Sequence, residues 1–215
     1  MFDNLDYLES KTKEHKRVEI LQVAMGLFIR DGIHNVTMQK IAKKSKISIR
    51  SLYYYYSNKE DLAVDIQISL FGSDWLKLDD EDTSELTAYE LLYKLKDNLV
   101  SYINNNPKVV KYIAAFDFYF YNSYPSDKYL IHLEKIQSSE LSSKIIRKAK
   151  LDNSIDDKGY GTLTTISTLF HSIMAYSQRI IYREKAMLLE KAGDKGSLEL
   201  HAQLLMESLK KDTLW

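Results

Sequence analysis

Few residues in this chain can interrupt a helix, and this feature most constrains its fold. Only seven glycines and two prolines occur among its 215 residues, and the stretches between them are rich in helix-forming residues. Short β-branched runs bounded by turn residues, which mark strands and hairpins, are scarce. Hydrophobic residues make up 45% of the chain, enough to form a core. We therefore predict an all-α protein with about nine helices.

The spacing of apolar residues predicts where these helices lie. In the N-terminal part we expect helices over residues 13–31, 38–45, 49–56 and from Lys59 towards Trp75. The acidic stretch 78–84 is the expected joint, and about five more helices should follow it, over residues 85–104, 107–121, 126–150, 156–186 and 197–211. The predicted organisation is an N-terminal arm over residues 1–12, a small helical domain over 13–74 and a larger helical domain over 75–215.

The residue types exclude several classes of protein. The chain has no cysteine, which rules out disulfides, thiolate zinc sites and a cysteine nucleophile. Its five histidines lack metal-ligand spacing and no glycine-rich phosphate loop is present, so we expect no enzyme activity, no metal and no cofactor. No apolar run has the length of a membrane span, and the first residues are acidic and polar. We therefore expect a cytoplasmic protein that does not enter a membrane.

Charge is unevenly distributed along the chain. The formal net charge is zero, yet residues 11–59 hold eleven Lys or Arg against three acids, Glu14, Glu19 and Asp31. A basic N-terminal domain joined to an acidic remainder is expected where only that domain meets phosphates. A solvated helix surface would have the same composition, so charge alone leaves both interpretations open.

Two short helices after a longer one are the arrangement of a helix-turn-helix, here over about residues 37–56, in which the second short helix enters the DNA major groove. At 100° per residue, Leu52 and Tyr56 lie on the side of that helix that faces the core, with Ile49 beside them. Arg50 and Tyr54 lie on the opposite side. A forked guanidinium and phenol hydroxyls suit contacts with base edges and phosphates.

A recognisable pattern of residues surrounds this motif. Its members are Ile20, Leu21, Ala24, Leu27, Phe28, Gly32, Val36, Thr37, Met38, Ile41, Ala42, Ile47, Ser48, Leu52, Tyr53, Tyr55, Tyr56, Asn58, Lys59 and Leu62. With these residues the chain resembles the TetR family of transcriptional regulators (TetR/AcrR type) over about residues 13–65. The remaining residues carry no motif that points to a family.

The resemblance implies which residues contact DNA. Thr37 should cap the second helix and touch phosphate, and Gln39 should reach a base edge. Lys59, at a helix N-terminus, should anchor a phosphate. The other implied contacts lie in the turn, at the entering end of the recognition helix and along its tyrosines: Lys46, Ser48, Ile49, Arg50, Ser51, Tyr53, Tyr54 and Tyr55. For Tyr55, partial burial is the alternative.

Two residues depart from the family pattern. Family members usually have Gly in the turn before the recognition helix, where this chain has Lys46, so a left-handed backbone there would cost about 1 kcal/mol. The family's usual Phe at the end of the aromatic run is replaced by Tyr56, whose hydroxyl needs a partner if it is buried.

For the larger domain, the resemblance implies a ligand chamber and a dimer interface made by the last two helices. Apolar residues at helical spacing fit that interface, with a purely intramolecular core as the alternative: Leu163, Ile166, Phe170, Ile173, Met174, Leu204 and Leu205. Residues 112–124 hold seven aromatics, which either line a cavity or fill a core. The ligand-binding candidates are Tyr89, Tyr93, Tyr112, Phe116, Tyr119, Phe120 and His171.

These observations favour a homodimeric repressor that binds a palindromic operator in double-stranded DNA and is released by a small apolar or aromatic effector. Repression, rather than activation, follows only from the resemblance. An enzyme is disfavoured because no catalytic constellation is visible. A protein-interaction module that has lost DNA binding is disfavoured because four implied DNA-contacting residues are retained: Arg50, Tyr53, Tyr54 and Lys59.

Overall fold

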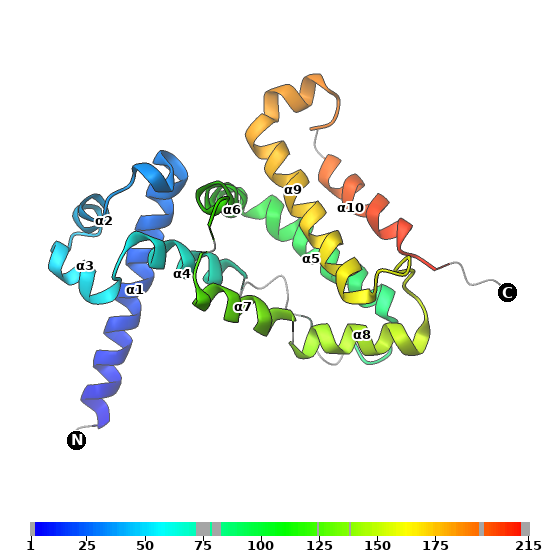
Figure 1. Ribbon diagram of the computed structural model, residues 1–215, viewed down its shortest axis with the longest axis horizontal. Coiled ribbons are helices and arrows are strands. Elements are labelled where there is room, and N and C mark those ends of the chain that lie inside the picture. The colour runs from blue at the N-terminus through cyan, green and yellow to red at the C-terminus, as the bar shows by residue number, and fades with distance from the viewer. Residues whose placement is uncertain are drawn as a thin grey trace. The chain divides into compact units, whose positions relative to one another are not determined.

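The all-α prediction is confirmed by a computed structural model, which describes residues 3–71, 78, 83–123, 125–137, 139–193 and 196–211 (Figure 1). The N-terminal elements are α1 (Asp3–Asp31), the 3₁₀ helix η1 (Ile33–Asn35), α2 (Met38–Lys44), α3 (Ile49–Tyr55) and α4 (Lys59–Phe71). They are followed by α5 (Ala88–Asn105), α6 (Pro107–Phe120), α7 (Asp127–Gln137), α8 (Glu140–Asp152), α9 (Thr162–Leu189) and α10 (Ser197–Ser208). Within the described residues, the β-structure consists of one isolated bridge between Ile155 and Lys210.

Three predicted helices differ clearly from their expected extents, one of them because α9 begins at Thr162 rather than at residue 156. The segment predicted as an N-terminal arm is helical from Asp3, because residues 3–12 contain no Gly or Pro, although the apolar periodicity begins later. The single helix predicted over 126–150 is two helices, α7 and α8. Ser139 starts α8, since its side chain accepts a hydrogen bond from the backbone N–H of Ser142 at 3.3 Å. The described residues therefore form ten α-helices rather than nine.

The chain divides into two compact units. One, called the head unit here, comprises Met1–Phe71 with Tyr112–Leu130, and the other, the body unit, comprises Gly72–Lys111 with Ile131–Trp215. The head unit therefore includes a segment that lies well beyond the predicted boundary at residue 74. This segment contains most of α6 and the start of α7.

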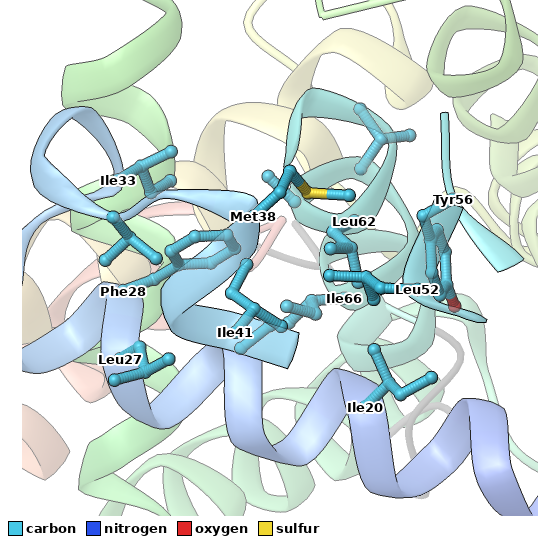
Figure 2. Close-up of a cluster of buried hydrophobic side chains, with 14 of the residues drawn as sticks. Ile20, Leu27, Phe28, Ile33, Met38, Ile41, Leu52, Tyr56, Leu62 and Ile66 are labelled. Carbon is cyan, nitrogen blue, oxygen red and sulfur yellow. The ribbon is translucent and has the colours of Figure 1, made fainter. Parts of the chain in front are cut away.

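Apolar residues of α1 to α4 form the core of the head unit (Figure 2). Ile20, Leu27 and Phe28 of α1 point towards side chains from the next helices. Leu52 and Tyr56 are both buried there, as the helical spacing predicts. Ile49, predicted beside them, is instead at the exposed start of α3. One buried turn thus fixes α3 and leaves its other sides in solvent.

Four helices build the core of the body unit. α5 buries a stripe of leucines, Leu91, Leu92, Leu95 and Leu99, and begins with a capping box between Thr87 and Glu90. α9 and α10 run antiparallel side by side in Figure 1 and pack on α5 and α8. Among the described helices, none is long and apolar enough to cross a bilayer.

Candidate nucleic-acid interface

The recognition helix predicted from sequence is α3, and its outward side is polar and aromatic. Tyr53 is 50% exposed and Tyr54 70% exposed, and Arg50 is exposed beside them. Leu52 and Tyr56 hold the inner side in the core. This arrangement presents one forked cation and two phenols to solvent from a helix that is fixed from below, as contact with a DNA groove requires.

Hydroxyl side chains cap both short helices as predicted. Thr37 Oγ1 accepts a hydrogen bond from the Lys40 backbone N–H at 3.2 Å, and Ser48 Oγ accepts one from the Ser51 N–H at 3.0 Å. Ser48 Oγ and Ser51 Oγ also lie 2.8 Å apart, within hydrogen-bond distance. The two serines at the entering end of α3 therefore hold each other in place while remaining exposed.

Ion pairs hold α2 against the end of α1. Asp31 binds Arg30 at 2.7 Å and Lys40 at 3.0 Å. The hydrogen bonds from Arg30 and Lys40 keep the pKa of the Asp31 carboxyl well below its usual range. Gln39, next to Lys40, stays exposed, so its amide is free to face DNA.

The turn between α2 and α3 contains a residue with a left-handed backbone conformation, as the family resemblance implies. Lys46 has φ +54°. The Lys46 N–H donates to the Lys43 carbonyl at 3.3 Å, and the Ile47 N–H donates to the Ala42 carbonyl at 3.1 Å. These bonds close the C-terminus of α2. They hold Lys46 in a backbone conformation that glycine would adopt without strain.

We expect Lys46→Gly to raise the free energy of unfolding by up to about 1 kcal/mol, because glycine adopts the left-handed region without strain. Thermal unfolding should register this as roughly 2–4 °C. Lys43→Gly, the same change within α2, is the control and should lower the stability by about 1 kcal/mol. A lower melting temperature for Lys46→Gly would contradict the strain argument.

The last two tyrosines of the run are less exposed than Tyr53 and Tyr54. Tyr55 is half-buried and packs edge-to-face on Tyr54, with ring centroids 5.4 Å apart, which agrees with the partial-burial alternative. The Tyr56 hydroxyl is buried beside the Arg17–Asp65 ion pair, and among the described residues it makes no hydrogen bond of good geometry. Burial raises the pKa of Tyr56 to about 12. The Phe usual at this position would avoid burying that hydroxyl.

Lys59 has a different role from the phosphate anchor predicted for it. Its Nζ donates to the carbonyl oxygens of Ile33 at 3.0 Å, His34 at 3.1 Å and Val36 at 3.4 Å. An ammonium has three N–H donors, so these carbonyls use all of them. The prediction is corrected because the carbonyls come from a turn more than twenty residues earlier in the chain, which local sequence patterns do not reveal.

Sequence reasoning also missed Asp65, a buried carboxylate on α4. It accepts a hydrogen bond from Arg17 of α1 at 2.9 Å and another from Lys128. Pairing with two cations compensates for its burial. The position of Asp65 within the apolar run of residues 62–66 was the available signal.

A model of the family described as "Bacterial regulatory proteins, tetR family" matches residues 20–66, the helices just described. Over these residues the chain matches the TetR family. The Bacillus subtilis "Fatty acid metabolism regulator protein" is 27% identical over 82 residues, 38% of this chain and 42% of that protein. An HTH-type transcriptional regulator of Staphylococcus aureus is 26% identical over 108 residues, 49% of this chain and 57% of its own. The matched stretches thus span about half the length of these curated relatives.

Solved structures of TetR-family proteins share the fold over almost the whole chain. A TetR-family regulator from Haemophilus influenzae superposes with a TM-score of 0.64 at 16% identity, covering 93% of this chain and 99% of that one. Thermus thermophilus FadR, described as a repressor in complex with lauroyl-CoA, gives a TM-score of 0.57 at 18% identity, covering 93% and 98%. TetR-family proteins are regulators rather than enzymes, as the sequence predicts here.

The aromatic residues predicted to bind a ligand are divided between the two units of the chain. Tyr112, Phe116, Tyr119 and Phe120 lie in the head unit, and Tyr89, Tyr93 and His171 lie in the body unit. Phe116 is buried against Phe120, with ring centroids 4.7 Å apart, and the Tyr112 hydroxyl donates to the Ala63 carbonyl at 2.7 Å. Tyr112 and Phe116 are therefore buried in a core, while Phe116 and Phe120 also border an open hollow of about 520 Å³, so both interpretations that the sequence leaves open have support.

The remaining ligand candidates have polar neighbours in the body unit. The Tyr93 hydroxyl donates to Gln203 at 2.7 Å, and the buried Lys96 ammonium lies 3.8 Å from the centre of the Tyr93 ring. The ring centroids of Tyr89 and Tyr93 lie 6.3 Å apart. His171 is exposed on α9, where it borders an open hollow of about 590 Å³. In the described part of the chain, no group of acidic and histidine side chains could hold a metal ion.

The residues predicted for the dimer interface are also divided. Ile173 is fully buried in the core of the body unit, so it is corrected to an intramolecular core residue. The neighbouring candidates Ile166, Phe170, Met174 and Leu205 are half-buried against the same core. Leu163 and Leu204 remain exposed, and Leu200 lies one turn before Leu204 on α10.

Proposed function

We propose that this TetR-family protein is a transcriptional repressor that binds a palindromic DNA operator as a homodimer and is released by a small effector. The observation that carries the DNA-binding proposal is the outward face of α3, where Arg50, Tyr53 and Tyr54 are exposed on a helix anchored by its buried side. In a major groove, Arg50 is positioned to donate two guanidinium N–H groups, one to O6 and one to N7 of a guanine. The phenols and Ser48 would contact phosphates, which sets the register without reading sequence.

The charges around α3 support the same proposal. Lys43, Lys44, Lys46 and Arg50 are exposed, and among the described residues no carboxylate pairs with any of them. Unpaired cations close together repel each other, and a bound polyanion such as DNA offsets this repulsion. The unpaired cations also argue against an interaction module that has lost DNA binding.

Selection of duplexes from a random-sequence pool tests this function. We expect enrichment of a palindrome whose half-sites lie about one helical turn apart or somewhat more, because a dimer places two α3 helices on one face of the duplex. Fluorescence anisotropy should then show tighter binding to that palindrome than to random DNA, by a factor of about 10³ or more. No enrichment, with equal affinity for all duplexes, would refute sequence-specific binding.

We further propose that α9 and α10 form the dimer interface. Leu200 is 60% exposed and Leu204 57% exposed on one side of α10, an unusual position for leucines unless another surface covers them. In TetR-family proteins the last two helices are expected to pair with their copies.

Leu204→Glu should shift the protein from dimer to monomer at micromolar concentration, because a symmetric contact would bury two carboxylates without partners. Light scattering after gel filtration measures the mass directly. Leu151→Glu is the matched control, since Leu151 is 80% exposed on α8 and outside the proposed interface. A dimer that persists in Leu204→Glu, or dissociation in both variants, would remove the support for this interface.

For the effector, we propose an apolar or aromatic small molecule that binds the body unit. The aromatic pair Tyr89 and Tyr93 offers ring surfaces and phenol hydroxyls, and the structurally similar Thermus thermophilus FadR was solved in complex with lauroyl-CoA. An effector releases the protein only if it binds more tightly to the DNA-incompetent arrangement than to the DNA-binding one. A coupling free energy of about 1–3 kcal/mol then lowers operator affinity by roughly 5- to 150-fold. A screen of lipids and aromatics by thermal shift, followed by DNA release, tests this part. Compounds that shift the melting temperature without releasing DNA would contradict it.

A further inference from the structure

One cation of α1 lies beside the recognition helix. The Nζ of Lys13 is 3.3 Å from the Tyr54 hydroxyl oxygen and 4.9 Å from the centre of the Tyr54 ring. Both residues are exposed. Figure 1 shows α1 continuing past α3, so a side chain from the first helix is able to reach the outward face of the helix-turn-helix.

Lys13 differs from the next cations along α1. Lys16 pairs with Glu19 at 2.7 Å, and Arg17 pairs with the buried Asp65 at 2.9 Å. Both therefore have local structural partners. Among the described residues, no carboxylate neutralises Lys13, and its hydrogen-bond acceptor is a phenol that itself belongs to the exposed face of α3.

We infer that Lys13 and Tyr54 together bind one phosphate of the DNA backbone. When the ammonium donates one hydrogen to the phenol oxygen, its other N–H groups stay available, and the phenol keeps its own hydrogen to donate. Two donors one hydrogen-bond length apart can reach two oxygens of the same phosphate, as charge-assisted bonds. α1 then takes part in DNA binding together with α2 and α3.

This inference rests on the proposed DNA-binding function and adds a contact that is independent of base sequence. A phosphate contact fixes the position of the protein on the duplex and contributes through release of counterions. Its loss should weaken binding to selected and random duplexes alike.

Lys13→Ala should lower affinity for both kinds of duplex by roughly threefold to tenfold at moderate salt, and reduce the slope of log affinity against log salt by about one per subunit. Anisotropy titrations across a salt series, using the selected palindrome and a random duplex, measure both quantities. Lys16→Ala is the matched control, because it removes the same charge from the same helix one turn away. It should leave the slope closer to wild type.

A double-mutant cycle with Tyr54→Phe tests the joint site. If one phosphate takes both donors, the double variant should lose less affinity than the sum of the single losses. If the salt slope of Lys13→Ala equals that of the wild type, whether or not its melting temperature falls, the inference is overturned. The proposed DNA-binding function would still stand. Wild-type protein that binds no duplex would instead overturn the proposed function itself.

Discussion

Arg50→Ala is expected to remove most of the discrimination between the operator and random DNA. A bidentate arginine contact with guanine provides about 1–3 kcal/mol of discrimination, and a dimer makes it twice, so the specificity ratio should fall roughly 30-fold or more. Binding to random duplexes should change little, since phosphate contacts dominate there. Competition titrations of the operator against random DNA measure the ratio.

The same substitution should leave the fold unchanged. Arg50 is exposed at the start of α3, and among the described residues none forms an ion pair with it. The melting temperature of the Arg50→Ala variant should therefore equal that of the wild type. Arg50→Lys is a useful companion, because it keeps the charge but loses the forked geometry. If Arg50→Ala keeps the sequence preference of wild-type protein, α3 does not read bases through this residue.

Lys59→Met is expected to destabilise the head unit by about 2–3 kcal/mol. The substitution keeps the apolar stem but leaves the carbonyls of Ile33, His34 and Val36 without the ammonium that they share. The expected decrease in melting temperature is roughly 4–12 °C. Thermal unfolding followed by circular dichroism provides the measurement.

Lys44→Met separates this structural role from phosphate binding. Lys44 is exposed at the end of α2 and, among the described residues, has no ion-pair partner. Its loss should reduce the salt slope of DNA binding by about one per subunit with little change in melting temperature. Lys59→Met should show the opposite pattern at temperatures where it stays folded. A reduced slope with normal stability in Lys59→Met would restore its phosphate role.

Features that depend on neighbouring residues could be predicted from sequence. Thr37 and Ser48 cap their helices because a hydroxyl reaches a backbone N–H three residues ahead. The left-handed turn found at Lys46 was implied by the family resemblance, in which Gly usually occupies this position. Leu52 is buried because helical spacing places it on the inner side of α3. All three effects act within a few residues.

The positions of long-range partners could not be predicted in this way. Lys59 was expected at a phosphate and instead binds three carbonyls of a preceding turn. Ile173 was expected at a dimer interface and instead fills the core of its own unit. In both cases the helix that carries the residue was predicted correctly. The sequence did not show which of several possible partners the side chain contacts in the folded protein.

An all-helical chain with a helix-turn-helix could be predicted from the residues alone, because helix propensity, capping and apolar spacing are local properties. The assignment of residues 112–130 to the head unit depends instead on contacts between distant parts of the chain. There Tyr112 donates to Ala63, and Lys128 binds Asp65, across more than forty residues of chain. An aromatic run carries the same hydrophobic signal whether it lines a cavity or fills a core, and the surface that it packs against, absent from local sequence, makes the difference.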